Sequence, residues 1–270
     1  MTIPKIAFSF WEGDQFTHLH YLTFQTFVKY NPDFKIIIYT STKSNCDLIK
    51  WSSGEQSKKL TNTYDIQNLK KIPNLELKHI DVEKEINYDK PLSSVWKSDI
   101  IRIMKLYEHG GFYIDFDTLF IGKIPESLFT FSQDLGVNTY ENVINNAFLV
   151  AAPNSPLVNI ILQNILNILH SDSVKQTYQQ FGPELITRLC INTDYQQNLY
   201  FIPNVLTCPY IWNEMDKLFK SNIRQDTDET FCLHWYNGGA IPREYCSNFM
   251  IDAINKDRSR FEYLLSNALL

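Results

Sequence analysis

Residues 94–117 read SVWKSDIIRIMKLYEHGGFYIDFD and decide the fold. Apolar side chains recur at helical intervals in the first part, which predicts an amphipathic helix from Ser94 to His109. The pair Gly110-Gly111 follows and supplies the left-handed backbone that commonly ends a helix. The apolar run Phe112-Tyr113-Ile114 then predicts a short buried strand. The stretch therefore joins a helix to a buried strand through a tight turn.

The rest of the chain alternates strands with helices. Strands are expected at Ile6 to Trp11, Phe34 to Tyr39, Leu75 to Ile80, Leu135 to Tyr140, Ala147 to Ala152 and Phe231 to Tyr236. Helices are expected from Phe16 to Tyr30, after Ser155-Pro156, after Gly182-Pro183 and in the tail from Glu244 onward. This pattern predicts an α/β domain with a mostly parallel sheet flanked by helices and a helical C-terminal portion. Ligands of such sheets bind beyond the carboxyl ends of the strands.

Composition and charge exclude several classes of protein. The 270 residues are 44% hydrophobic and 20% charged, which is typical of globular domains. The formal charge of −5 comes without a basic stripe, which argues against a nucleic-acid polymer as a partner. No repeat or linker divides the sequence, so we expect a single domain over residues 1–270.

Cysteine usage and hydropathy indicate the compartment. No C-x-x-C pair occurs among Cys46, Cys190, Cys208, Cys232 and Cys246, which argues against a zinc cage or a disulfide framework and for reduced thiols. The N-terminus lacks the pattern of a signal peptide, and no stretch approaches 18 uninterrupted apolar residues. We therefore expect no membrane span and a cytoplasmic location.

The predicted buried strand ends on an acidic motif, Asp115-Phe116-Asp117. In an extended segment, residues i and i+2 face one side about 6.6 Å apart, at roughly 3.3 Å per residue, so both carboxylates would converge on one ligand. One could bind a divalent cation at about 2.1 Å while the other holds a ribose hydroxyl or a metal-bound water. Such a cation neutralises charge on a leaving nucleoside diphosphate. Alone a D-x-D tripeptide is weak evidence, but two buried carboxylates with no cationic neighbour in the sequence favour a metal.

Five segments carry a resemblance to a known family. They are Ser98 to Arg102, Gly110 to Asp117, Ile3 to Trp11, Asn145 to Phe148 and Gly182-Pro183. Together they resemble the D-x-D sugar-binding region of glycosyltransferase family 32, and they are similar to the related glucosyltransferase domain of large clostridial toxins. The resemblance implies a GT-A fold, a nucleotide-sugar donor, Mn²⁺ or Mg²⁺, and retention of the anomeric configuration.

The resemblance also implies roles for residues. Asp117 would ligate the metal, Asp115 would contact ribose, sugar and metal, Asp99 and Arg102 would hydrogen-bond the donor sugar, and Trp11 would stack on the nucleobase. These four charged residues form the expected catalytic set. The expected donor site is completed by Phe10, Ser98, Tyr113, Asn145, Asn146 and Trp235.

A late segment is expected to complete the metal shell. His234 lies in an apolar run that opens into Asn237-Gly238-Gly239, and such a loop can close over a ligand. Neutral imidazole suits Mn²⁺, but the segment departs from the serine-tryptophan ending usual in the family, so His234, Asn237 or both could reach the metal.

The resemblance also divides the chain into halves and suggests substrates. Residues 1–122 would bind the nucleotide sugar, and residues 123–270 would bind the acceptor. UDP-glucose or UDP-galactose is the favoured donor and GDP-mannose the second, with a glycan or other hydroxyl as acceptor.

Each assignment has a plainer alternative. Asp99 and Arg102 are three apart on a helix and could form an exposed ion pair. Trp11 and His234 could be ordinary core residues. Asn145 and Asn146 could form a turn before a strand.

Two other functions also remain open. In a haloacid-dehalogenase-type phosphatase, Asp115 would be the nucleophile and Asp117 the general acid, although Thr118 comes one position early for that family. The aromatic content of 14% would also suit a non-catalytic sugar-binding relative. A two-carboxylate glycosidase is disfavoured, because carboxylates so close on one strand cannot flank a glycosidic bond.

Overall fold

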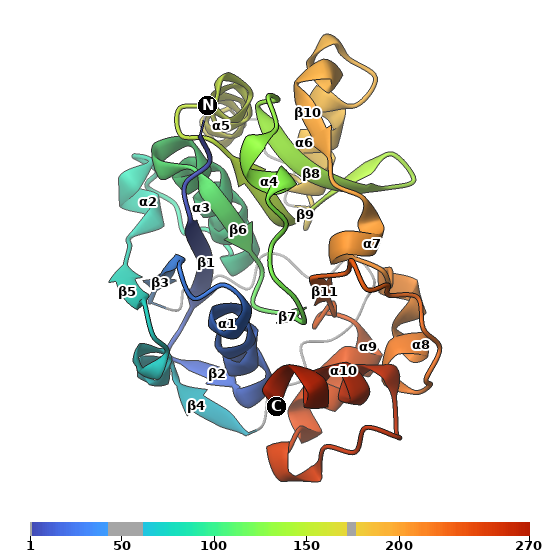
Figure 1. Ribbon diagram of the computed structural model, residues 1–270. Helices are drawn as coiled ribbons and strands as arrows, with labels where there is room; N and C mark the ends of the chain where they lie inside the picture. Colours follow the sequence, from blue (N-terminus) through green and yellow to red (C-terminus); the bar gives the residue numbers. More distant parts are fainter. Residues whose placement is uncertain (1, 43–61, 172–176) are drawn as a thin grey trace.

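A mixed sheet forms the centre of the protein (Figure 1). The computed structural model describes residues 2–42, 62–171 and 177–270, and Cys46 lies outside them. Within the described residues, seven strands form this sheet in the order β10-β8-β9-β6-β1-β3-β5. Their bounds are β1 (Ile6–Glu12), β3 (Lys35–Ser41), β5 (Leu75–His79), β6 (Gly111–Ile114), β8 (Leu135–Tyr140), β9 (Val143–Ala151) and β10 (Leu199–Phe201).

The direction of one strand determines where the site forms. Strand β1 pairs in parallel with β3 and β6, and β3 pairs in parallel with β5. Strand β9 runs antiparallel to both β6 and β8, with Ile114 opposite Phe148. The amino end of β9 therefore lies beside the carboxyl end of β6. The mostly parallel sheet expected from the sequence is confirmed.

Both faces of the sheet are covered, which explains the continuous apolar runs of its strands. Phe8 and Tyr113 point to the face covered by helices α3 (Ser94–His109), α5 (Pro156–Leu169) and α6 (Pro183–Cys190). Their strand neighbours Ala7 and Phe112 point to the face covered by α1 (His18–Tyr30). Side chains along a strand alternate between faces, so one strand supplies two cores.

The remaining elements are short or lie toward the C-terminus. The short helices are α2 (Val82–Glu85), α4 (Ser127–Thr130), α7 (Asn204–Thr207) and α8 (Met215–Phe219). The C-terminal helices α9 (Ala240–Asn248) and α10 (Arg260–Leu269) lie near α1, and Lys29 donates a hydrogen bond to the carbonyl of Ala268 (Figure 1). Two small antiparallel pairs join β2 (Gln15–Thr17) to β4 (Thr63–Asp65) and β7 (Thr118–Phe120) to β11 (Cys232–His234).

Local signals fix the helix that leads into the acidic motif. The Ser93 side chain accepts a hydrogen bond from the backbone N–H of Trp96, which caps the first turn of α3. Gly110 ends the helix at a φ of 67°. Gly111 has a φ of 98°, and a Cβ atom there would lie 2.3 Å from the carbonyl oxygen of Ile6. The helix expected from Ser94 to His109 is confirmed, and the glycine pair lets the chain pass close to β1.

Some expected boundaries were wrong. Phe16 lies in β2, because Thr17 caps α1 by accepting a hydrogen bond from the N–H of His20. The tail turns helical at Ala240, earlier than Glu244, and a 3₁₀ turn at Ile251–Ala253 separates its two helices. The late strand keeps only the middle of the expected run, at Cys232–His234. No described helix is long and apolar enough to cross a membrane, and a cytoplasmic location stays a prediction.

A buried ion pair holds the C-terminal helices to the preceding segment. Asp226 is 4% exposed, and its oxygens lie 2.9 and 2.5 Å from the guanidinium of Arg260. The hydroxyl of Tyr210 donates to the same carboxylate at 2.9 Å. A buried carboxylate needs such partners, because its desolvation otherwise costs several kcal/mol.

The variant Arg260→Ala should therefore destabilise the protein by about 3 kcal/mol, since it leaves Asp226 buried without its main counter-charge. Urea unfolding followed by circular dichroism measures the change. The matched control is Lys123→Ala, whose ion pair with Glu126 is exposed and should contribute less than about 1 kcal/mol. Equal losses in both variants would contradict this account.

Candidate active site

The acidic motif lies in a turn between β6 and β7. Asp115 follows the last residue of β6, and Phe116 and Asp117 form the turn. The N–H of Asp115 donates to the carbonyl of Ala147 on β9 at 2.9 Å. The expectation of an extended segment was therefore wrong, because the chain reverses toward β7. The two carboxylates still converge, but the turn brings them together.

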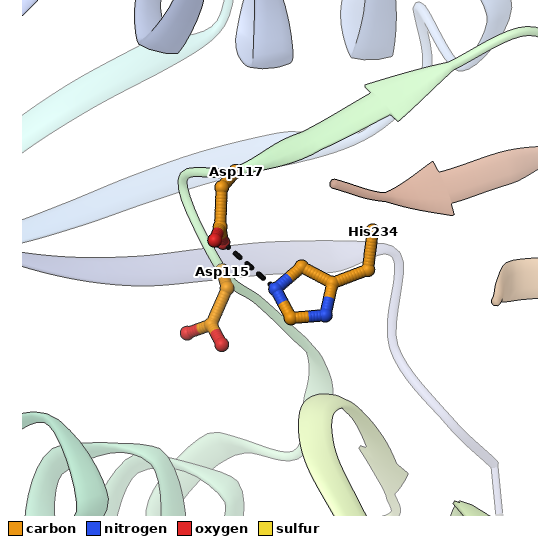
Figure 2. A group of neighbouring side chains, drawn as sticks. All are labelled: Asp115, Asp117 and His234. Carbon is orange, nitrogen blue, oxygen red and sulfur yellow. Dashed lines mark ion pairs between the residues drawn. The ribbon is translucent and has the colours of Figure 1, made fainter. Parts of the chain in front are cut away.

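His234 reaches the motif from a distant part of the chain. Strand β11 pairs with β7 so that His234 lies opposite Thr118. Its Nε2 atom lies 3.0 Å from Oδ1 of Asp117, as Figure 2 shows. One ligand atom from each of Asp115, Asp117 and His234 lies within 4.8 Å of the others. His234 is thus no ordinary core histidine, because its ring faces two carboxylates.

Asn237 also contacts the motif, through its backbone. Its N–H donates to Oδ2 of Asp117 at 2.7 Å. The preceding residue, Tyr236, has a φ of 47°, a left-handed conformation that costs energy in a residue with a side chain. This turn aims the N–H of Asn237 at the carboxylate. Asp117 is therefore held by one short segment, which runs from His234 at the end of β11 to Asn237.

Arg102 is a cationic neighbour of Asp115, so the expectation that the acidic motif has none was wrong. It is 5% exposed, and its guanidinium lies 3.3 Å from Asp99 and 3.6 Å from Asp115. It also donates to the carbonyl of Asn146 at 2.6 Å and to the hydroxyl of Ser98 at 2.8 Å. The alternative of an exposed Asp99–Arg102 ion pair was wrong, because both residues are buried.

The two asparagines belong to strand β9. The expected turn before that strand was wrong, since β9 begins at Val143. The side chain of Asn146 donates to Oδ1 of Asp99 at 2.9 Å, and that of Asn145 donates to the hydroxyl of Tyr236 at 3.2 Å. Within the described part of the chain, Oδ2 of Asp99 is buried without a hydrogen-bond partner. A buried carboxylate oxygen without a hydrogen-bond partner is unusual in a folded protein.

The electrostatic environment separates the three aspartates. Burial raises the pKa of Asp99 to about 6, against the charge of Arg102. Burial also raises the pKa of Asp115, again opposed by Arg102. Burial would raise the pKa of Asp117 too, but the charge and hydrogen bond of His234 lower it to about 2. Burial lowers the pKa of His234, but the charge and hydrogen bond of Asp117 outweigh burial and raise this pKa to about 10.

These groups open on a cavity of about 570 Å³. Seven residues expected from the sequence line it: Asp99, Arg102, Asp115, Asp117, Asn145, Asn146 and His234. Further lining residues that were not expected include Val95, Tyr178, Gln179, Trp212 and Tyr236. Pockets of this size bind small molecules in many proteins.

Other expected donor-site residues do not line the cavity. Phe10 is buried in the core on the α3 face of the sheet. Trp11 packs on Phe116, with ring centres 4.7 Å apart, and its indole N–H donates to the carbonyl of Gln15. Trp235 is 1% exposed. Their direct contact with a nucleotide sugar stays a prediction.

Two more expected donor-site residues, Ser98 and Tyr113, contact residues that line the cavity. The hydroxyl of Tyr113 donates to Oδ1 of Asp115 at 2.6 Å, and it lies 3.0 Å from the hydroxyl of Ser98. Both side chains therefore orient groups that line the cavity, and a direct contact with the donor stays a prediction for them as well.

The cluster of Asp115, Asp117 and His234 has the chemistry of a metal site. Carboxylate oxygen and imidazole nitrogen together suit a first-row divalent cation such as Mn²⁺ more than Mg²⁺, which prefers oxygen ligands and retains several waters. Asp117 is anionic, and its hydrogen bond from Asn237 orients it as an outer-shell partner would.

Comparisons with known proteins show what the chain is similar to. Residues 17–139 match the family model described as glycosyltransferase sugar-binding region containing DXD motif. Residues 17–139 are therefore similar to a glycosyltransferase sugar-binding region that contains a DXD motif. The resemblance seen in the sequence is confirmed, and the match favours a transferase over a phosphatase. No curated protein sequence matches the chain.

Solved structures establish the fold. PaToxG glycosyltransferase is 20% identical, with a TM-score of 0.50 over 76% of this chain and 71% of its own. The glycosyltransferase GlyE of Streptococcus pneumoniae TIGR4 is 10% identical, with a TM-score of 0.51 over 99% of this chain, which spans 61% of GlyE. The galactosyltransferase LgtC, solved with donor and acceptor sugar analogs, is 12% identical, with a TM-score of 0.50 over 97% and 95%. The GT-A fold expected from the sequence is confirmed.

Gly182 allows the polar cluster to pack. A Cβ atom at this position would lie 2.4 Å from the side-chain nitrogen of Asn146 and 2.8 Å from both carboxylate oxygens of Asp99. The variant Gly182→Ala must displace these buried groups and should destabilise the protein by about 1–3 kcal/mol, measured by urea unfolding. In the control Gly239→Ala the nearest atom is a proline ring carbon at 3.2 Å, so the loss should be smaller. A larger loss in the control would contradict the packing argument.

Proposed function

We propose that the protein is a metal-dependent glycosyltransferase that moves a hexose from a nucleotide sugar to a hydroxyl of a glycan or other acceptor, with retention of anomeric configuration. The observation behind the proposal is the convergence of Asp115, Asp117 and His234 at one point of the cavity. That convergence combines residues of the DXD region with a histidine that lies outside it.

In this proposal Asp117 and His234 hold a divalent cation, with Asp115 completing the set. Mn²⁺ is favoured over Mg²⁺ by the imidazole ligand. When bound, the cation stabilises negative charge on the departing nucleoside diphosphate. Metal binding requires His234 without its proton, so the ion would replace the hydrogen bond that now joins it to Asp117.

The donor sugar would occupy the part of the cavity lined by Asp99 and Arg102. Asp99 lines the cavity, and its carboxylate would accept a hydrogen bond from a sugar hydroxyl. Arg102 holds that carboxylate in place and offsets part of the negative charge of Asp99 and Asp115. Hydroxyl recognition by fixed, buried polar groups gives strong selectivity, because an unfilled site leaves those groups unpaired.

The start of α9 suits the diphosphate. Gly239 lines the cavity and precedes the first turn of α9, and no side chain caps that turn. The backbone N–H groups of Ala240 and Ile241 at this helix start would bind phosphate, aided by the helix dipole, whereas Pro242 has no N–H. UDP-glucose or UDP-galactose is our first candidate donor and GDP-mannose the second. A hexose donor agrees with the name of LgtC, a galactosyltransferase of similar fold.

Retention would proceed without a covalent intermediate. We assign no residue as a nucleophile. Retention would result if the acceptor hydroxyl attacks the anomeric carbon of the donor on the same face from which the diphosphate departs. Catalysis then rests on charge stabilisation of the leaving diphosphate and on placement of the acceptor hydroxyl.

The proposal is tested first by ligand-dependent stability. Thermal unfolding with Mn²⁺ and each of UDP-glucose, UDP-galactose and GDP-mannose should show a rise in Tm for one donor, because a ligand at about 100 times its Kd adds about 2.7 kcal/mol to the free energy of unfolding. Slow hydrolysis of the same donor should need Mn²⁺. If no nucleotide sugar raises Tm or is hydrolysed, the proposal fails.

The variant Asp117→Asn tests the metal assignment. It should lose at least about 100-fold in Mn²⁺-dependent donor hydrolysis, since it removes an anionic ligand and the charge that orients His234. Far-UV circular dichroism should remain native. The control Asp228→Asn changes a carboxylate that is 97% exposed and should hydrolyse the donor as the unmodified protein does. Full activity in Asp117→Asn would exclude Asp117 as a metal ligand.

A further inference from the structure

One aromatic side chain in the cavity wall is exposed. Trp212 lies in the 3₁₀ turn Trp212–Glu214 and is 63% exposed, although it lines the cavity. By contrast, Trp96 and Trp235 are 4% and 1% exposed. Among the described residues its indole forms no hydrogen bond and no ring contact. An exposed indole in a cavity wall has an entire face available for a ligand.

The exposure of Trp212 does not come from a loose backbone. Tyr210, two residues earlier, is fully buried, and Met215, three residues later, is 3% exposed. The side chain of Glu214 accepts a hydrogen bond from the N–H of Ile211 at 3.4 Å and one from Gln225 at 3.3 Å. The turn is therefore anchored on both sides. A platform held in this way loses little conformational entropy when a ligand binds.

The cavity wall has two kinds of lining. Its charged residues are joined to one another by hydrogen bonds and ion pairs, and none of these contacts involves Trp212. The uncharged residues that line the cavity include Trp212, Val95, Gln179 and Pro183, which supply apolar surface and one amide. Such a lining suits a neutral ligand with an apolar face and polar edges.

We propose that Trp212 is the binding platform for a carbohydrate acceptor, on which a pyranose ring stacks while one of its hydroxyls points toward the aspartate cluster. This inference rests on the proposed glycosyltransferase function. The C–H groups on one face of a pyranose are weakly positive, and they pack well on the negative face of an indole. The ring hydroxyls at the edge of the sugar can bond the amide of Gln179.

The test compares two reactions of the same site, namely transfer to sugar and hydrolysis by water. Methyl β-glucoside, methyl β-galactoside and lactose serve as acceptor probes with Mn²⁺ and the donor found above. In Trp212→Ala the ratio of transfer to hydrolysis should fall about tenfold through a higher KM for the acceptor. Trp212→Phe keeps an aromatic face and should recover most of the ratio. Tyr195→Ala, which removes an aromatic side chain that is 39% exposed, should keep the ratio of the unmodified protein.

The possible outcomes separate a failure of the Trp212 platform from a failure of the proposed glycosyltransferase function. An unchanged ratio of transfer to hydrolysis in Trp212→Ala would overturn the platform. The platform would also be overturned if the KM for the donor in hydrolysis rose as much as the KM for the acceptor in transfer. That second result would place Trp212 against the nucleotide. Hydrolysis by the unmodified protein with no transfer to any probe would also overturn a carbohydrate acceptor at Trp212. If the unmodified protein neither binds nor hydrolyses any nucleotide sugar, the glycosyltransferase proposal itself fails, and the platform fails with it.

Discussion

The buried guanidinium of Arg102 is the contact on which the site depends. It lies between the carboxylates of Asp99 and Asp115 and donates to the backbone of Asn146. Burying such a charge is costly unless partners surround it, so the three elements that provide those partners must meet in one arrangement. These elements are α3, β6 and β9. One ion-pair network thus fixes the helix, the strand that carries the acidic motif and the antiparallel strand beside it.

Helix α3 serves both the core and the site. Its apolar residues pack on the sheet, while several charged residues on the same helix are buried as well. Lys97 is one of these, and it lies 3.0 Å from both Glu12 and Glu83. The helix is therefore held at two points by ion pairs, one near the end of β1 and one near the acidic motif. This double attachment keeps Asp99 and Arg102 in register with the strands.

The sequence predicted the parts that local signals determine. A capping serine and a glycine pair bound α3, so its limits agree with the prediction. The predicted arrangement of the motif was wrong. The motif forms a turn between β6 and β7, and this turn depends on the pairing of β7 with a strand more than 100 residues later. His234 was identified, but its contact with Asp117 follows from that pairing. Trp212 was missed because neighbouring residues in sequence do not show whether an indole is buried or exposed in a cavity.

The turn also explains how the two aspartates of the motif can differ in their surroundings. In an extended strand they would share one environment. Here Asp115 faces Tyr113 and Arg102, whereas Asp117 faces His234 and the N–H of Asn237. Burial raises the pKa of Asp115, while the partners of Asp117 overcome burial and hold its pKa near 2. Asp117 is thus the more firmly ionised of the two carboxylates, and this difference arises from tertiary contacts and not from the spacing of the motif.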